Sequence, residues 1–451
     1  MSDPGDAIDV ARTLVAAALE AGAEAADAVV ADGTGLEVGI RLGEPEKLVR
    51  SREHRVGLRV LVGGATAVVS SADLSTATLG ELAHQACALA RTTAPDPHAG
   101  LADPSDLATA PPDLDLWDAA ATTLDPAFGF ELARTAERAA LDAAVEITNS
   151  EGAEFGGGGG TAAYASSNGF AGGYRRSSFS LSVVPIATRD GAMQRDSWWT
   201  ASHRLERLDA PAEVGREAAR RTLRRLGARQ IPTGAYPVVF DPQMAASLLR
   251  HLAGAIAGPS LYRRASFLLD RVGERIAPEG VTVVDDPLLP GAPGSRPFDG
   301  EGVASRRATI VDRGVLASYL LDSYSARRLG LRTTGHAARS PGDSPTVAPT
   351  NFFLAAGPHS PEAIIGSVER GLYVTELIGF GVNTVTGDYS RGAAGLWIED
   401  GRLTHAVEEV TIAGSLPEMF AGIEMIGDDV VFRSAVTAPT LKIARMTVAG
   451  R

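Results

Sequence analysis

A glycine-rich run near the C-terminus restricts the fold of this chain more than any other feature. Residues 379–395 read GFGVNTVTGDYSRGAAG, with small polar side chains between the glycines. Glycine allows backbone conformations and close approaches that a side chain would prevent. The next turn signal, Asp400-Gly401, predicts a β-hairpin. The run therefore predicts either a tight series of turns or a loop whose backbone lies against a ligand, a peptide or another strand.

Length, charge and cysteine content exclude several classes of protein. With 451 residues, of which 45% are apolar and 22% charged, the chain is long enough for two or three domains. A formal net charge of −13 argues against nucleic-acid binding, which needs clustered Lys and Arg. The main basic cluster, between Arg216 and Arg229, is typical of a helix with a charged solvent-facing side.

The same features indicate a cytoplasmic location. The single cysteine, Cys87, excludes a disulfide framework and suits a reducing compartment. The N-terminus lacks the basic and apolar segments of a signal peptide, and no apolar stretch has the length of a membrane span. We therefore expect a cytoplasmic protein without a membrane or nucleic-acid partner.

Helix and strand signals predict an α+β protein built from three segments. Residues 1–93 combine two helices with alternating strand patterns, which is typical of an α/β sandwich-like unit. A linker rich in Pro, Asp and Ala is expected over 94–115, followed by a central α+β segment over 116–232. In residues 233–451, β-rich stretches separate capped helices, which predicts a curved, mostly antiparallel sheet with packed helices.

Two further features have competing interpretations. The five glycines at 156–160 lack the Gly-Lys-Ser/Thr of a phosphate loop, and we interpret them as a flexible or edge-strand connection. The carboxylates of Asp285, Asp286, Asp299 and Glu301 could hold a cation. Because no further ligand is spaced to join them, solvated turns are the expected alternative.

Several blocks of this sequence, with the glycine-rich run, resemble the TldD/PmbA (TldD/TldE) family. Its members are bacterial and archaeal proteins described as metallopeptidases and as modulators of DNA gyrase. The resemblance covers nearly the whole chain and is strongest after Ala235. The blocks that carry it, in chain order, are 236–241, 266–270, 285–287, 298–302, 334–337 and 349–351.

The resemblance also decides which branch of the family this chain fits. The zinc-carrying, TldD-like branch has His-Glu-x-x-x-His on the helix after the Val-Val strand, where two imidazoles hold zinc and the carboxylate acts as general base. The matching positions here are Arg250, His251 and Ala255, so neither histidine ligand is present. A cysteine ligand expected near the C-terminus is also missing. The chain thus resembles the TldE/PmbA-like branch, with no metal and no catalytic residue of its own.

The candidate binding residues lie in the glycine-rich run. They are predicted to face an extended peptide or the partner's metal site, and they are Asn383, Thr386, Gly387, Asp388, Ser390 and Gly392. A lone histidine on an apolar helix, such as His251, is more often packed than metal-bound.

Two hypotheses for the function remain open. In the first, the chain is the non-zinc subunit of a TldD/TldE-type heteromeric metallopeptidase that acts on unfolded or extended peptides, in proteolysis and peptide maturation. The resemblance then implies a zinc-carrying TldD-like partner. In the second, the chain is a stand-alone, non-catalytic binding or regulatory protein that kept the fold.

Overall fold

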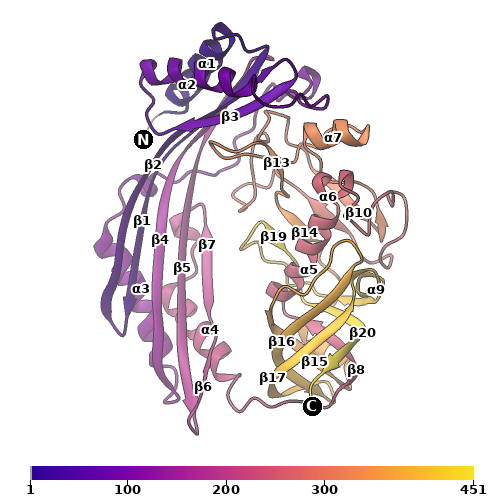
Figure 1. The fold of residues 1–451 in the computed structure, drawn as a ribbon. Coiled ribbons are helices and arrows are strands. Elements are labelled where there is room, and N and C mark those ends of the chain that lie inside the picture. Colours follow the sequence, from indigo (N-terminus) through magenta and orange to yellow (C-terminus); the bar gives the residue numbers. More distant parts are fainter. Residues whose placement is uncertain (1–2) are drawn as a thin grey trace.

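The computed structural model describes residues 3–451 as a long curled sheet beside a β-rich C-terminal domain (Figure 1). The N-terminal half supplies the sheet, and the chain then crosses to the C-terminal domain, which contains a barrel. The predicted α+β class, with a curved and mostly antiparallel sheet, is confirmed.

The large sheet has seven strands in the order β3-β2-β1-β4-β5-β6, and β7 pairs with β5. All of these pairings are antiparallel. The strands are β1 (Ala25–Arg41), β2 (Glu44–Val62), β3 (Ala65–Ser71), β4 (Ile147–Ser166), β5 (Ala171–Arg189), β6 (Ala192–Arg195) and β7 (Trp198–Ser202). Because β1 pairs with both β2 and β4, the predicted N-terminal and central segments share one sheet instead of building two.

Two pairs of helices cover one face of this sheet. Helices α1 (Pro4–Glu20) and α2 (Thr76–Ala90) bury Ala and Leu side chains at one end of the strands. Helices α3 (Pro126–Leu141) and α4 (Pro211–Leu223) do the same at the other end. These four helices therefore do not cover the opposite face of the central strands.

The run of five glycines lies inside a central strand, so its interpretation as a flexible or edge connection is wrong. Residues 156–160 belong to β4 and pair with β1 on one side and β5 on the other. A Cβ atom at Gly158 or Gly160 would collide with a backbone carbonyl of β1. Glycine is needed here because neighbouring strands approach too closely for a side chain.

The C-terminal domain is organised around a six-stranded sheet in the order β17-β16-β15-β8-β20-β18, in which β17 also pairs with β20. Its strands are β8 (Gly234–Phe240), β15 (Arg370–Ile378), β16 (Asp388–Glu399), β17 (Arg402–Ser415), β18 (Ile423–Ile426) and β20 (Leu441–Ala449). A second sheet has the order β11-β10-β9-β14-β19, and β12 pairs with β13. These strands are β9 (Val283–Asp285), β10 (Ala308–Asp312), β11 (Val315–Leu316), β12 (Ala337–Ala338), β13 (Thr346–Val347), β14 (Phe352–Leu354) and β19 (Val436–Thr437).

The helices of this domain are short. They are α5 (Pro242–Ala255), α6 (Gly258–Tyr262), α7 (Ser323–Leu329), α8 (Pro361–Gly366) and α9 (Leu416–Ala421). All except α6 have a side-chain N-cap. The predicted hairpin is present between β16 and β17, where Asp400 and Gly401 have φ of 48° and 74°. Positive φ at both central residues is typical of a type I′ turn.

The stretch predicted as a linker, residues 94–115, lies against the C-terminal domain. Arg327 donates to the backbone carbonyls of His98, Gly100 and Leu101 at 2.7–3.1 Å. Short 3₁₀ helices occur here and further on, at η1 (Pro104–Asp106), η2 (Ala119–Thr122) and η3 (Leu205–Arg207). No helix among residues 3–451 is long and apolar enough to cross a membrane.

Candidate functional site around helix α5 and strand β16

Helix α5 begins where the sequence predicts. The side chain of Asp241 accepts a hydrogen bond from the Gln243 N–H at 3.0 Å, and Pro242 occupies the first helical position. Asp241 also contacts the buried Arg221 of α4, with 3.3 Å between Oδ2 and Nη1. The leucine stripe of α5 faces the main core. This arrangement turns the next side of the helix, which carries His251, toward β16.

His251 packs against Tyr389, the second residue of β16. The two ring centroids are 6.0 Å apart, and the ring planes meet at 78°. Nε2 of His251 and the hydroxyl of Tyr389 are buried, and neither has a hydrogen-bond partner among the described residues. Burial lowers the pKa of His251, and the charges of Arg391 and Arg250 act in the same direction. Burial raises the pKa of Tyr389 to about 12, and the neighbouring Arg391 guanidinium opposes this shift through its charge and its closeness to the hydroxyl. Both side chains are therefore neutral near pH 7.

Arg391 completes this group, which we call the donor cluster: His251, Tyr389 and Arg391. Because side chains alternate along a strand, Arg391 lies on the same face of β16 as Tyr389. Its Nη2 donates to the carbonyl of Leu377 at 3.2 Å, while its Nε is buried and unpaired within residues 3–451. Neither Arg391 nor the exposed Arg250 forms an ion pair with any described acidic residue. The cluster therefore combines uncompensated positive charge with buried donors.

A zinc ion does not fit the residues at the positions that match His-Glu-x-x-x-His. Ala255 is fully buried and has no ligating atom, and Arg250 is a cation. His251 alone cannot complete a site that needs three or four ligands. Across residues 3–451, no group of three or more His, Cys, Asp or Glu side chains could hold a metal. The chemistry of this position is that of hydrogen-bond donation, not of metal ligation.

The predicted loop residues lie on the other side of β16 or before it. Asn383, Thr386, Asp388 and Ser390 are all exposed. Asn383 accepts from the Val385 N–H at 2.9 Å, and the Thr386 hydroxyl donates to Asp388 at 2.5 Å, so the loop is held by its own side chains. Asn383, Asp388 and Ser390 border a surface depression of about 490 Å³ that includes Phe380 and Gly414.

The two predicted glycines differ in role. Gly387 has φ of +86°, and a Cβ atom there would lie 2.7 Å from Pro417, so close approach is required at this position. Gly392 pairs within the sheet, with no forbidden contact for a Cβ atom. Next to Gly387, Thr386 lines a cavity of about 580 Å³ together with Phe267, Pro417 and others.

Sequence reasoning missed Tyr389 and Arg391, although they are within the predicted run. The signal was the strand period: if β16 begins at Asp388, then 388 and 390 face one side and 389 and 391 the other. A reading of the whole run as a loop removed that alternation. The structure thus brings His251 together with Tyr389 and Arg391, and not with Asp388 or Ser390.

The acidic residues expected in solvated turns are buried, so that expectation is wrong. Asp285, Asp299 and Glu301 are exposed by 0%, 2% and 1%. Asp285 accepts from the backbone N–H of Thr350 at 2.8 Å, and His336 lies 3.4 Å away. Burial makes such carboxylates costly unless partners surround them. The partners of Asp285 and Glu301 come from distant parts of the chain, which local composition does not reveal.

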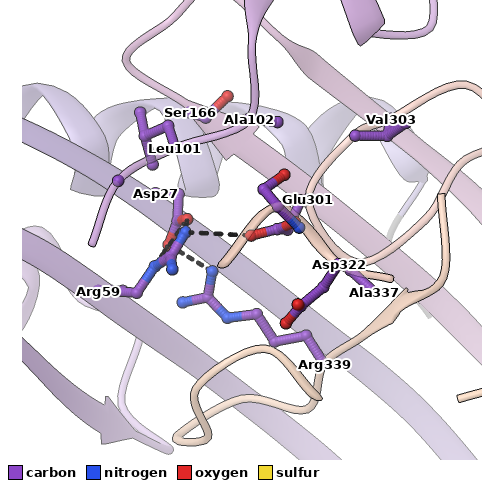
Figure 2. A network of polar contacts seen from close by, with 12 residues as sticks. Asp27, Arg59, Leu101, Ala102, Ser166, Glu301, Val303, Asp322, Ala337 and Arg339 are labelled. Atoms are coloured by element: carbon purple, nitrogen blue, oxygen red, sulfur yellow. Dashed lines mark hydrogen bonds and ion pairs between the residues drawn. The ribbon is translucent and has the colours of Figure 1, made fainter. Parts of the chain in front are cut away.

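Figure 2 shows one of these networks, at the junction of the large sheet and the C-terminal domain. Asp27 of β1 pairs with Arg59 of β2 and with Arg339 from the C-terminal domain, and all three side chains are buried. Tyr164 donates to Asp27 at 3.2 Å. Glu301 lies 3.9 Å from Arg59 and accepts from the Ser323 N–H at 2.8 Å. These contacts hold the two parts of the molecule together.

Comparisons with known proteins agree with this architecture. Family models described as PmbA/TldA metallopeptidase domain 1, central domain and C-terminal domain match residues 26–90, 119–226 and 233–450. The chain is 40% identical over 428 residues to Metalloprotease PmbA of Escherichia coli O157:H7, covering 95% of this chain and 93% of that protein. It is 37% identical to the PmbA homolog of Haemophilus influenzae, with 96% and 94% covered.

Solved structures show the same fold over the full length. A Bacteroides thetaiotaomicron protein titled as a modulator of DNA gyrase superposes with a TM-score of 0.91 at 29% identity, covering 98% of each chain. TldE from Thermococcus kodakarensis superposes with a TM-score of 0.87 at 20% identity, covering 97% of this chain and 99% of that one. From the domain matches and the full-length relatives together, this chain belongs to the PmbA/TldD metallopeptidase family.

Proposed function

We propose that this chain is the non-zinc subunit of a heteromeric metallopeptidase of the TldD/TldE type, acting on unfolded or extended peptides. One observation carries the proposal. The helix that bears the zinc motif in the TldD-like branch is present as α5, but its ligand positions are Arg250 and Ala255. The rest of the chain aligns over nearly its whole length with proteins named metalloprotease.

The zinc and the general base would then be supplied by a TldD-like partner. This chain would contribute surface and substrate binding, and hydrolysis would take place at the partner's metal. The likeness to TldE of Thermococcus kodakarensis supports this assignment at the level of the fold. Relatives named TldD homolog, such as that of Haemophilus influenzae at 31% identity over 216 residues, support a common origin of the two kinds of subunit.

Co-expression with a relative that keeps His-Glu-x-x-x-His tests the proposal. We expect a hetero-oligomer that contains zinc and digests an unfolded peptide, whereas the purified chain alone contains no stoichiometric zinc and digests nothing. A partner whose motif glutamate is replaced by glutamine is the matched control, and it should assemble without activity. If no such relative from the same genome associates with the chain, the alternative of a stand-alone binding or regulatory protein is favoured.

The loop before β16 gives a second test. Because the Asp388 side chain is exposed and accepts a hydrogen bond only from Thr386 of the same loop, Asp388→Ala should leave the melting temperature nearly unchanged. Loss of one exposed hydrogen bond costs about 1 kcal/mol or less. We expect reduced peptide digestion by the assembled complex, with Asp142→Ala on α3 as the exposed control. Full activity of the Asp388→Ala complex would remove the loop from the proposed peptide path.

A further inference from the structure

We propose that His251, Tyr389 and Arg391 form a binding site for the carboxylate of an extended peptide. Among residues 3–451, no acidic side chain forms an ion pair with Arg391 or Arg250, and His251 lies on α5, the helix that carries the zinc motif in the TldD-like branch. The inference rests on the proposed function only for the nature of the ligand, because binding itself is a property of this chain alone.

The hydrogen-bonding capacity of the cluster points to an acceptor ligand. The Tyr389 hydroxyl, the Arg391 Nε–H and His251 Nε2 are buried atoms without partners among the described residues. A phenol and a guanidinium are donors, and a neutral imidazole donates from whichever ring nitrogen carries its proton. A carboxylate offers about four lone-pair sites, so one carboxylate can accept from all three groups. A buried donor without a partner is costly, and a bound acceptor removes that cost.

The charge of the cluster selects an anion over a neutral acceptor such as water. Arg391 and Arg250 both lie near His251, close enough for their charges to lower its pKa. Apart from burial, only these arginines shift the pKa values of His251 and Tyr389, and no carboxylate contributes. A planar guanidinium suits a carboxylate in particular, because its donors match the two oxygens.

The surroundings suit a peptide rather than a small inorganic anion. His251 and Arg391 are only partly buried, so the cluster can be reached from the surface. The segment beside Arg391 exposes apolar side chains: Ile378, which pairs with Gly392, is 57% exposed and Phe380 is 101% exposed. A ligand with a carboxylate at one end and apolar side chains next to it would contact both features. A peptide C-terminus or an acidic side chain within a peptide has this chemistry.

Calorimetric titration of the purified chain at low ionic strength tests the inference. The probes are an N-acetylated alanine–leucine peptide with a free C-terminal carboxylate, the same peptide as its C-terminal amide, the amide peptide with one internal glutamate, and inorganic phosphate. We expect the carboxylate peptide to bind and the amide to bind at least about tenfold more weakly, because a hydrogen bond to a charged group contributes about 1.5–3 kcal/mol. Binding of the glutamate peptide would assign the site to acidic side chains as well as to chain ends.

Two variants locate the site, each with a matched control. Tyr389→Phe removes only the hydroxyl, and Arg391→Met removes the charge while keeping an apolar stem. Each variant should bind the carboxylate peptide about tenfold more weakly than the unchanged chain does. Tyr236→Phe and the exposed Arg370→Met, elsewhere in the same domain, should bind as the unchanged chain does. Melting curves of all four variants show whether each is folded.

Three results would overturn the inference. These are equal binding of the acid and amide peptides, unchanged affinity in both folded cluster variants, and binding of phosphate without binding of any carboxylate peptide. None of these results depends on a partner subunit. A chain that binds the carboxylate peptide but never assembles with a zinc-carrying relative would keep this inference while removing the proposed function.

Discussion

The buried glutamate at the domain junction predicts a pH dependence of stability that runs opposite to that of most acidic residues. Burial raises the pKa of Glu301 from 4.5 to about 7, with Arg59 opposing the shift and Asp299 adding to it. Between these two values the folded protein holds a proton that the unfolded chain has released. Unfolding then releases that proton, so the free energy of unfolding falls as pH rises through this window.

The size of the effect follows from the width of the window. Each pKa unit corresponds to about 1.36 kcal/mol, and the window spans about 2.5 units, so Glu301 makes the protein about 3 kcal/mol less stable at pH 8 than at pH 4.5. Asp27 and Asp285 have lowered pKa values, and their stabilising contributions are lost only as pH falls below the ordinary range for aspartate. The two kinds of contribution therefore occur in different pH ranges.

Glu301→Gln isolates the contribution of this one group. Glutamine keeps an oxygen that can accept from the Ser323 N–H but does not titrate. Urea unfolding followed by tryptophan fluorescence at several pH values between 5 and 8 gives the stability of both proteins. We expect the stability of the variant relative to the unchanged chain to rise by about 2.5 kcal/mol across this range. The exposed Glu46→Gln control should show no such trend, and a pH-independent difference for Glu301→Gln would refute the reasoning.

Two further predictions concern glycines and are checked by thermal melting. Gly387→Ala should cost more stability than Gly379→Ala. Both residues have positive φ, of +86° and +82°, so both variants carry a backbone strain of about 1–3 kcal/mol, but only the first would bring Cβ to 2.7 Å from a proline ring. Equal costs would contradict the steric argument. Gly158→Ala should destabilise the large sheet because its Cβ would meet a backbone carbonyl of β1, whereas Gly80→Ala, with open space inside α2, should stabilise by about 0.5–1 kcal/mol.

Features encoded by neighbouring residues could be predicted from the sequence. The start of α5 was evident from Asp241 and Pro242, and the hairpin from Asp400 and Gly401, because caps and tight turns depend on a few adjacent residues. The α+β class followed from the same local signals. The predicted binding residues of the glycine-rich run remain predictions.

Features that depend on distant pairing could not be predicted. Strand β1 lies beside β4, more than a hundred residues later in the chain, and this pairing turns the five glycines at 156–160 into the middle of a sheet. Glu301 is likewise buried against Arg59, which comes from the N-terminal sheet. No pattern near the five glycines or near Glu301 indicates these contacts, so a flexible connection and a solvated turn were the natural expectations.

The loss of the zinc motif could be predicted from the sequence, whereas the donor cluster could not. A missing ligand is visible in the sequence, because the His-Glu-x-x-x-His ligands lie at a fixed spacing along one helix. What replaces the ligands depends on which strand packs against that helix, and here β16 brings Tyr389 and Arg391 to His251. With Arg250 at one ligand position and Arg391 brought in from β16, the charges around His251 favour an anion over a cation. If the two proposals hold together, the zinc of a partner and the arginine of this chain would act on opposite ends of one peptide: the metal would polarise the bond to be cut, and the donor cluster would hold a carboxylate.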